Sequence, residues 1–257
     1  MSYALGSPRQ PVVLLRLDRA LSPSFDAPEP VPSAHAVMPC DWVLAGGLRA
    51  FRDDAAHLGR STAALKIFLT LALEIPSGRR LRHERGSALL AYAELSALTG
   101  LSHQLVAAGK KLLADQGLIS TRPEGQGRRL RYFLEGYDEA PARRRLPYRT
   151  LPPKPGEPAP VDLRRFSTRQ AGDLHALKVY LCLCALGRPG EDRVLLQLDN
   201  LCALTNVAAG KARAALETLA THGLAAPSPV PARGYGPGSC PESWEVGVGR
   251  LQRCSAA

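Results

Sequence analysis

The segment Leu95-Ser-Ala-Leu-Thr-Gly-Leu101 gives the strongest indication of the fold, because Leu201-Cys-Ala-Leu-Thr-Asn-Val207 repeats its pattern 106 residues later. Two more segments recur in the same order along the chain. Ala64-Leu-Lys-Ile-Phe-Leu-Thr-Leu is matched by Ala176-Leu-Lys-Val-Tyr-Leu-Cys-Leu, and Gln116-Gly-Leu is matched by His222-Gly-Leu. The first of these pairs is 112 residues apart and the second is 106 apart, which places a six-residue insertion in the first copy. The recurrence predicts that one small fold occurs twice.

The positions of these matches, together with the chain's composition, divide it into five parts. Its 257 residues favour two domains, and its composition, 45% hydrophobic and 22% charged, is typical of a folded protein. Prolines and glycines cluster between and beside the two copies and mark the boundaries. The expected parts are an extended N-terminal arm (1–50), a first domain (51–140), a basic Pro-rich linker (141–165), a second domain (166–250) and a tail (251–257).

Apolar spacing predicts the same order of elements in both copies. In the first copy, Gly100 permits a tight turn, Leu101 fills the corner between two helices, and Ser102 caps the second of them. The expected elements of the first copy are a helix (61–75), a strand (89–92), a helix (94–99), a helix (103–116) and two strands (118–122 and 128–134). Those of the second are a helix (173–186), a strand (194–197), two helices (199–205 and 208–222) and a looser hairpin that ends at 244–248.

Residues 95–102, followed by Val106 and by Leu113 through Ile119, resemble the helix-turn-helix and following strand of the winged-helix family. The resemblance implies a mainly α fold with small β-hairpins, of class α+β, in which two winged-helix domains are joined by a Pro/Arg-rich linker. The tandem arrangement, with Ala-Leu-Lys-Ile-Phe-Leu opening a domain, is similar to that of replication initiators of plasmids and mobile elements. Winged-helix transcription regulators are the other group that it resembles.

The charge of the chain favours a polyanionic partner. Lys plus Arg number 33 against 23 for Asp plus Glu, which gives a net charge of +10. Residues 122–169 contribute twelve basic residues against six acidic ones. Together with the helix-turn-helix resemblance, this excess leads us to expect binding to double-stranded DNA.

In winged-helix proteins the second helix of the helix-turn-helix enters the major groove. Gln104 suits a bidentate contact to adenine, and lysines and arginines suit phosphates. The residues expected at DNA are Ser102, His103, Gln104, Ala107, Lys110 and Lys111 on that helix, Arg128, Arg129 and Arg131 on the hairpin, Arg79, Arg80 and Arg82 in the insertion, Arg143, Arg144 and Arg145 in the linker, and Lys211 and Arg213 in the second copy.

The corresponding helix of the second copy begins with the small residues Ala208-Ala-Gly210. One interpretation is that it reads less sequence than the first copy or packs against a partner. The other is that its small front approaches the groove closely and contacts thymine methyl groups. The sequence leaves both open.

Other functions have less support in the sequence. The six cysteines include no C-x-x-C pair, and their spacing fits no common zinc pattern, so no metal or cofactor is predicted. The Gly-Lys pairs lack Walker spacing, and no catalytic signature occurs, so the chain is not expected to be an enzyme. No apolar run approaches a membrane span and the start of the chain lacks a secretion signal, so a cytoplasmic location is expected. The alternatives are a scaffold or adaptor subunit of a nucleoprotein complex and an RNA-binding protein. Partner proteins of a replication or transcription complex, and a homodimer, are also left open.

Overall fold

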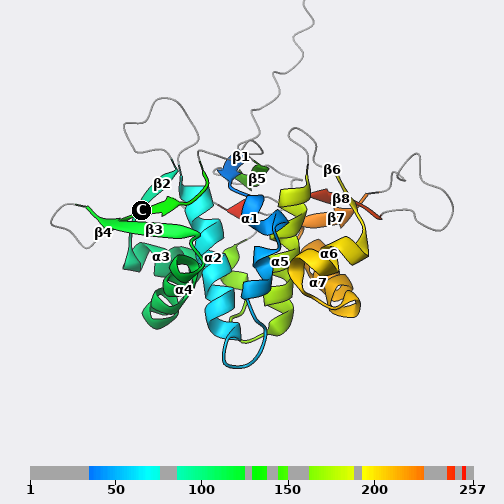
Figure 1. Ribbon diagram of the computed structural model, residues 1–257, viewed down its shortest axis with the longest axis horizontal. Coiled ribbons are helices and arrows are strands. Elements are labelled where there is room, and N and C mark those ends of the chain that lie inside the picture. Colours follow the sequence, from blue (N-terminus) through cyan, green and yellow to red (C-terminus); the bar gives the residue numbers. More distant parts are fainter. Residues whose placement is uncertain are drawn as a thin grey trace, which may run out of the picture. The chain divides into compact units, whose positions relative to one another are not determined.

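The computed structural model describes residues 35–75, 86–124, 129–137, 144–149, 162–187, 193–228, 242–246 and 251–252. Their fold is α+β, as the sequence predicts. In the described part of the chain, helices lie beside three small sheets, and the elements of the two sequence copies follow one another along the chain (Figure 1).

The two copies, called here the first repeat and the second repeat, share one order of elements. The first repeat comprises α2 (Leu58–Glu74), β2 (Ser87–Ala91), α3 (Tyr92–Thr99), α4 (His103–Asp115), β3 (Ile119–Pro123) and β4 (Arg129–Leu134). The second comprises α5 (Ala171–Leu186), β6 (Arg193–Leu196), α6 (Leu198–Thr205), α7 (Ala209–Thr221), β7 (Ala225–Pro227) and β8 (Glu242–Val246). The bounds lie within a few residues of those predicted from the apolar spacing.

The sheets of the two repeats agree in strand order and in register. Both are antiparallel, in the orders β2-β4-β3 and β6-β8-β7. Ala88 lies opposite Tyr132 in the first repeat, and Val194 lies opposite Trp244 in the second. A slip of one residue would turn every side chain to the other face, so the common register keeps Tyr132 and Trp244 both buried.

The longest helices, α2 and α5, form the centre of the described structure. They contact each other, while α4 lies against α2 and α7 lies against α5 (Figure 1). Because neighbours cover it on several sides, α2 is buried continuously from Ser61 to Leu73, and α5 from Leu174 to Ala185. Helices that are apolar almost all round are typical of such central positions.

The prediction of an extended arm through residue 50 is wrong for residues 35–50. These residues form β1 (His35–Met38), α1 (Asp41–Leu44) and a short 3-10 helix, η1 (Gly47–Ala50). Met38, Val43 and Leu48 are fully buried, and α1 contacts α5. The apolar side chains among the prolines are therefore part of the core. The rest of the predicted arm, residues 1–34, lies outside the described residues.

The predicted linker also contains folded structure. Strand β5 (Arg144–Arg149) pairs antiparallel with β1 and parallel with β9 (Leu251–Gln252), and a 3-10 helix, η2 (Leu163–Arg165), precedes α5. Leu163 and Phe166 are buried. Lys66 Nζ of α2 donates to the carbonyl of Phe166 at 2.8 Å, so the two repeats contact each other directly across this segment. A picture of two domains separated by a free spacer therefore needs correction.

The segments that precede the two central helices each contact the other repeat. The η1 segment lies against α6, where Arg49 Nε and Nη2 donate to the carbonyl of Ala203 at 3.0 and 2.7 Å. The η2 segment lies against α3, and the side chain of Arg164 covers Gly100. This exchange fixes each helix–turn–helix against a segment of the opposite repeat.

Candidate nucleic-acid interface

The turn between α3 and α4 forms as the sequence predicts. Gly100 has a φ of +67°, which favours glycine, and Leu101 is buried at the corner. The hydroxyl of Ser102 accepts a hydrogen bond from the backbone N–H of Leu105 at 3.3 Å, so Ser102 caps α4. In the second repeat Asn206, with a φ of +53°, occupies the position of Gly100.

A close contact with α2 determines which face of α4 is exposed. A Cβ added at Gly109 would lie 2.8 Å from the backbone nitrogen of Ala64, so only a hydrogen at this position lets the two helices approach so closely. Val106 and Leu113 are buried beside it. The opposite face is exposed and carries four of the residues expected at DNA: His103, Gln104, Ala107 and Lys111. Their spacing along α4 places all four on one side of the helix.

Lys110 differs from its neighbours on α4. It is half-buried, with Nζ 4.5 Å from the centre of the Tyr92 ring and 5.1 Å from that of Tyr132. The ring faces attract the ammonium group. The edge of His103 also meets Tyr92, at 6.4 Å between ring centres. Lys110 therefore packs its ammonium group against two aromatic rings, one of α3 and one of β4, whereas the sequence predicts that it contacts a phosphate.

The hairpin arginines separate into two kinds. Arg129 is exposed, and Nη2 donates to Glu94 Oε1 at 2.5 Å, while Glu94 Oε2 accepts from the backbone N–H of Ala91 at 2.6 Å. The side chain of Arg131 is only 6% exposed and contacts Ser87 and Glu124. The guanidinium of Arg131 is therefore held beneath the surface by its partners, whereas the sequence predicts that it contacts DNA.

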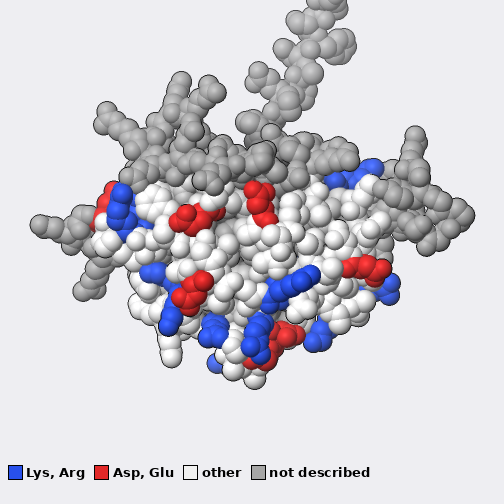
Figure 2. Space-filling view, in the orientation of Figure 1, with Lys and Arg blue, Asp and Glu red and all other residues white. Residues whose placement is uncertain are grey.

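The arginines expected at DNA in the insertion and the linker, together with Arg128 of the hairpin, fall into two groups. Arg144 and Arg145 belong to β5, opposite Met38 and Val37 of β1, and their side chains lie outside the described part of the molecule. The others are outside it altogether: Arg79, Arg80, Arg82, Arg128 and Arg143. On the face shown in Figure 2, Lys and Arg side chains spread over the region where the helices lie, and Asp and Glu side chains lie among them.

The start of α7 is less polar than that of α4. Ala208 offers no side-chain cap, and Ala209 and Gly210 are exposed. Arg213 is exposed, as expected of a residue at DNA. Lys211 is exposed as well, but its Nζ lies 3.3 Å from Asp53 Oδ2.

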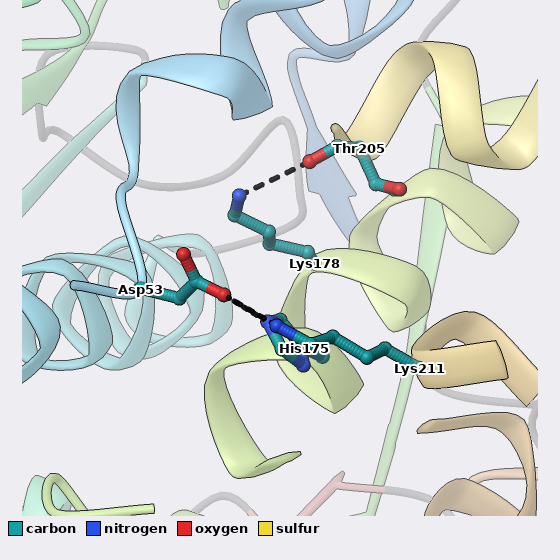
Figure 3. Close-up of polar contacts among 5 residues, drawn as sticks. All are labelled: Asp53, His175, Lys178, Thr205 and Lys211. Atoms are coloured by element: carbon teal, nitrogen blue, oxygen red, sulfur yellow. Dashed lines mark hydrogen bonds and ion pairs between the residues drawn. The ribbon is translucent and has the colours of Figure 1, made fainter. Parts of the chain in front are cut away.

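Asp53 connects the two repeats in a way that sequence reasoning missed. Its Oδ2 lies 3.0 Å from His175 Nε2 of α5 as well as 3.3 Å from Lys211 Nζ of α7 (Figure 3). The three residues are far apart along the chain, so no local pattern announces their contact. Only the position of the segment before α2 against α5 and α7 brings them together.

Burial and pairing shift the pKa values of this region. The hydrogen bond with His175 holds the pKa of Asp53 below its usual value, while burial lowers that of His175. Burial also lowers the pKa of Lys178 to about 8 and that of Lys66 to about 8. Lys178 Nζ donates to the carbonyl of Thr205 at 3.0 Å (Figure 3). Each buried lysine thus has a carbonyl partner, and Asp53 is an anion at neutral pH.

The described residues contain no helix that combines the length and the apolar character needed to cross a bilayer. Nor do they contain a cluster of three or more His, Cys, Asp or Glu side chains placed to hold a metal ion.

The sequence and the structure were also compared with known proteins. No family model matches the chain, and no curated protein or solved structure matches it. Function is therefore inferred from the residues and contacts described above.

Proposed function

We propose that the chain is a sequence-specific double-stranded DNA-binding protein built from two winged helices, with α4 as the helix that reads bases. The observation that carries the proposal is the exposed face of α4, where His103, Gln104, Ala107 and Lys111 follow a capped turn. A helix presented in this way suits the major groove, where residues of its first turns reach base edges.

The repeated element order supports the winged-helix assignment of both halves. A helix, a strand, a helix–turn–helix and a returning hairpin occur in the same order and register in each. Arg129 is exposed at the start of β4, beside the turn of the hairpin that follows α4, which is the part of a wing expected to meet the DNA backbone. The net charge of +10 supports a polyanionic partner.

Within this class, we propose a replication initiator or a transcription regulator of a plasmid or mobile element. Protection of several repeated sites at an origin would favour initiation. A single protected promoter site with altered transcription would favour regulation.

Gln104→Ala tests whether α4 reads bases. On the preferred site, selected from a random pool, the substitution is expected to cost about 1–3 kcal/mol, because a bidentate contact to adenine is lost. On random DNA it is expected to cost little. Gln116→Ala is the matched control, since Gln116 is exposed at the opposite end of α4. Equal losses on both DNAs would contradict a reading role for Gln104.

One observation favours a second candidate function, that of a scaffold in a nucleoprotein complex. The front of α7 offers the small residues Ala208, Ala209 and Gly210, which suit contact with a protein surface better than recognition of bases. Retention on DNA separates the two candidates. A folded protein that fails to bind any duplex at low salt but joins a protein complex would support the scaffold, and competition by duplex RNA of equal length tests the RNA alternative.

A further inference from the structure

The carboxylate of Asp53 contacts both His175 and Lys211, which is the only lysine of α7. The side chain of His175 is 5% exposed and contacts the same carboxylate oxygen that Lys211 contacts. An exposed ion pair ordinarily contributes little, because two long side chains must be ordered to form it. Here the buried imidazole already fixes one partner, so less ordering is needed for Lys211 to join it.

The contact nevertheless lies at the surface. The side chains of Asp53 and Lys211 are 43% and 59% exposed, so solvent ions and a polyanion can reach both. Lys211 lies in the first turns of α7, the part of a recognition helix that approaches DNA. A phosphate that approaches this helix meets an ammonium group already paired with a carboxylate.

The first repeat offers the comparison. Lys111 is exposed on α4, and no carboxylate of the described residues contacts its ammonium group. The two lysines therefore differ in what they give up when they bind a phosphate. Lys211 must leave Asp53, whereas Lys111 leaves no carboxylate of the described residues.

We propose that Asp53 competes with DNA phosphate for Lys211, so that Lys211 adds little backbone affinity while this inter-repeat contact is intact. The proposal rests on the DNA-binding function proposed above. It assigns Asp53 a role in setting how strongly the α7 side of the molecule holds DNA. Loss of the Asp53 carboxylate frees Lys211 to bind the DNA backbone and removes a negative charge beside this lysine.

A double-mutant cycle on the full chain tests the competition, with a random duplex as the probe and salt varied at pH 7.5. Asp53→Asn is expected to tighten binding several-fold at low salt and to steepen the salt dependence by about 0.9, the value for one added phosphate contact. Lys211→Gln alone is expected to change affinity little. Added to Asp53→Asn, it is expected to abolish the steeper slope.

Two control variants complete the design. Lys111→Gln is expected to weaken binding and to flatten the slope by about 0.9, since no carboxylate of the described residues contacts Lys111. Asp199→Asn removes an exposed acid of α6 from the same repeat and is expected to leave the slope unchanged. Circular dichroism and thermal unfolding check that each variant is folded.

The outcomes separate the proposals. If the wild type binds DNA but Asp53→Asn leaves affinity and slope unchanged, the competition is overturned. It is also overturned if Lys211→Gln alone weakens binding as much as Lys111→Gln, a result that does not depend on the folding of any Asp53 variant. If neither the wild type nor any variant binds DNA at low salt, the proposed function itself fails.

Discussion

The helices α4 and α7 occupy the same place in the two repeats but have different surroundings. Ser102 caps α4, and Gly109 brings it against the backbone of α2. The start of α7 lacks a side-chain cap, and its lysine contacts Asp53 of the opposite repeat. The same order of elements thus contains α4, whose exposed face is polar, and α7, whose exposed front consists of small residues. The comparison teaches that repeated architecture does not imply two equal binding surfaces.

The largest effect on stability is expected from substituting two glycines, one in close contact with a neighbouring helix and one with open space beside it. Gly109→Ala is expected to destabilise the protein by about 1–3 kcal/mol, because its Cβ would lie within 3 Å of the α2 backbone. Gly210→Ala on α7 is expected to stabilise it, by up to about 1 kcal/mol, because nothing lies within 4 Å of its added Cβ and Ala favours helix. Urea unfolding measures both. A destabilised Gly210→Ala, or a stabilised Gly109→Ala, would contradict the proposed difference.

An intermediate effect on stability is expected from exchanging the N-cap residues of α4 and α7. Ser102→Ala is expected to cost about 1 kcal/mol, because the backbone N–H of Leu105 loses its acceptor. The reciprocal change, Ala208→Ser, is expected to stabilise α7 by about 0.5–1 kcal/mol. Thermal unfolding of the two single variants checks both signs. If Ala208→Ser has no effect while Ser102→Ala destabilises, the start of α7 differs from that of α4 in more than its cap.

The smallest effect on stability is expected from the buried lysines Lys66 and Lys178. They occupy equivalent positions in the two repeats and are expected to behave alike. The pKa of Lys66 and of Lys178 is about 8 in the folded protein, below the ordinary value of 10.5. Between these values the unfolded chain binds more protons, so these lysines make the free energy of unfolding rise with pH. From pH 7.5 to 8.5 the rise is expected to be no more than about 1 kcal/mol for each lysine.

The buried cysteines act in the opposite direction at higher pH. Burial raises the pKa of Cys182 to about 12, so its contribution to stability is lost as the pH rises above the ordinary value of 9. The wild type is therefore compared with Lys178→Met and Lys66→Met, which keep the cysteines. Its stability is expected to improve relative to each of them as the pH rises. A difference independent of pH would show that the lysines are not held at a lowered pKa.

Much of the repeat was predictable from the sequence, because local pattern determines it. The apolar spacing of the helices, the turn at Gly100, the buried corner at Leu101 and the cap at Ser102 each depend on neighbouring residues. The exposed side of α4 followed from the same periodicity. These features needed no knowledge of the other repeat.

Contacts between distant segments were not predictable in this way. Arg131 resembled an exposed wing arginine, but its partners Ser87 and Glu124 bury it. Residues 35–50 resembled an extended arm because prolines precede them, yet Met38 and Val43 belong to the core. Asp53 meets His175 and Lys211 only because the segment before α2 lies against the second repeat. Except for Glu124, which is seven residues from Arg131, these partners are remote in sequence, so the local pattern carries no signal of them.

Binding of the wild-type protein to a random duplex of roughly 30 base pairs, followed by a salt titration, tests the central claim most directly. We predict binding at low salt, with a slope of log affinity on log salt steeper than about −2.7, the value for three phosphates at about −0.9 each. Flat salt dependence, or no binding at low salt by a folded protein, would contradict a DNA-binding function.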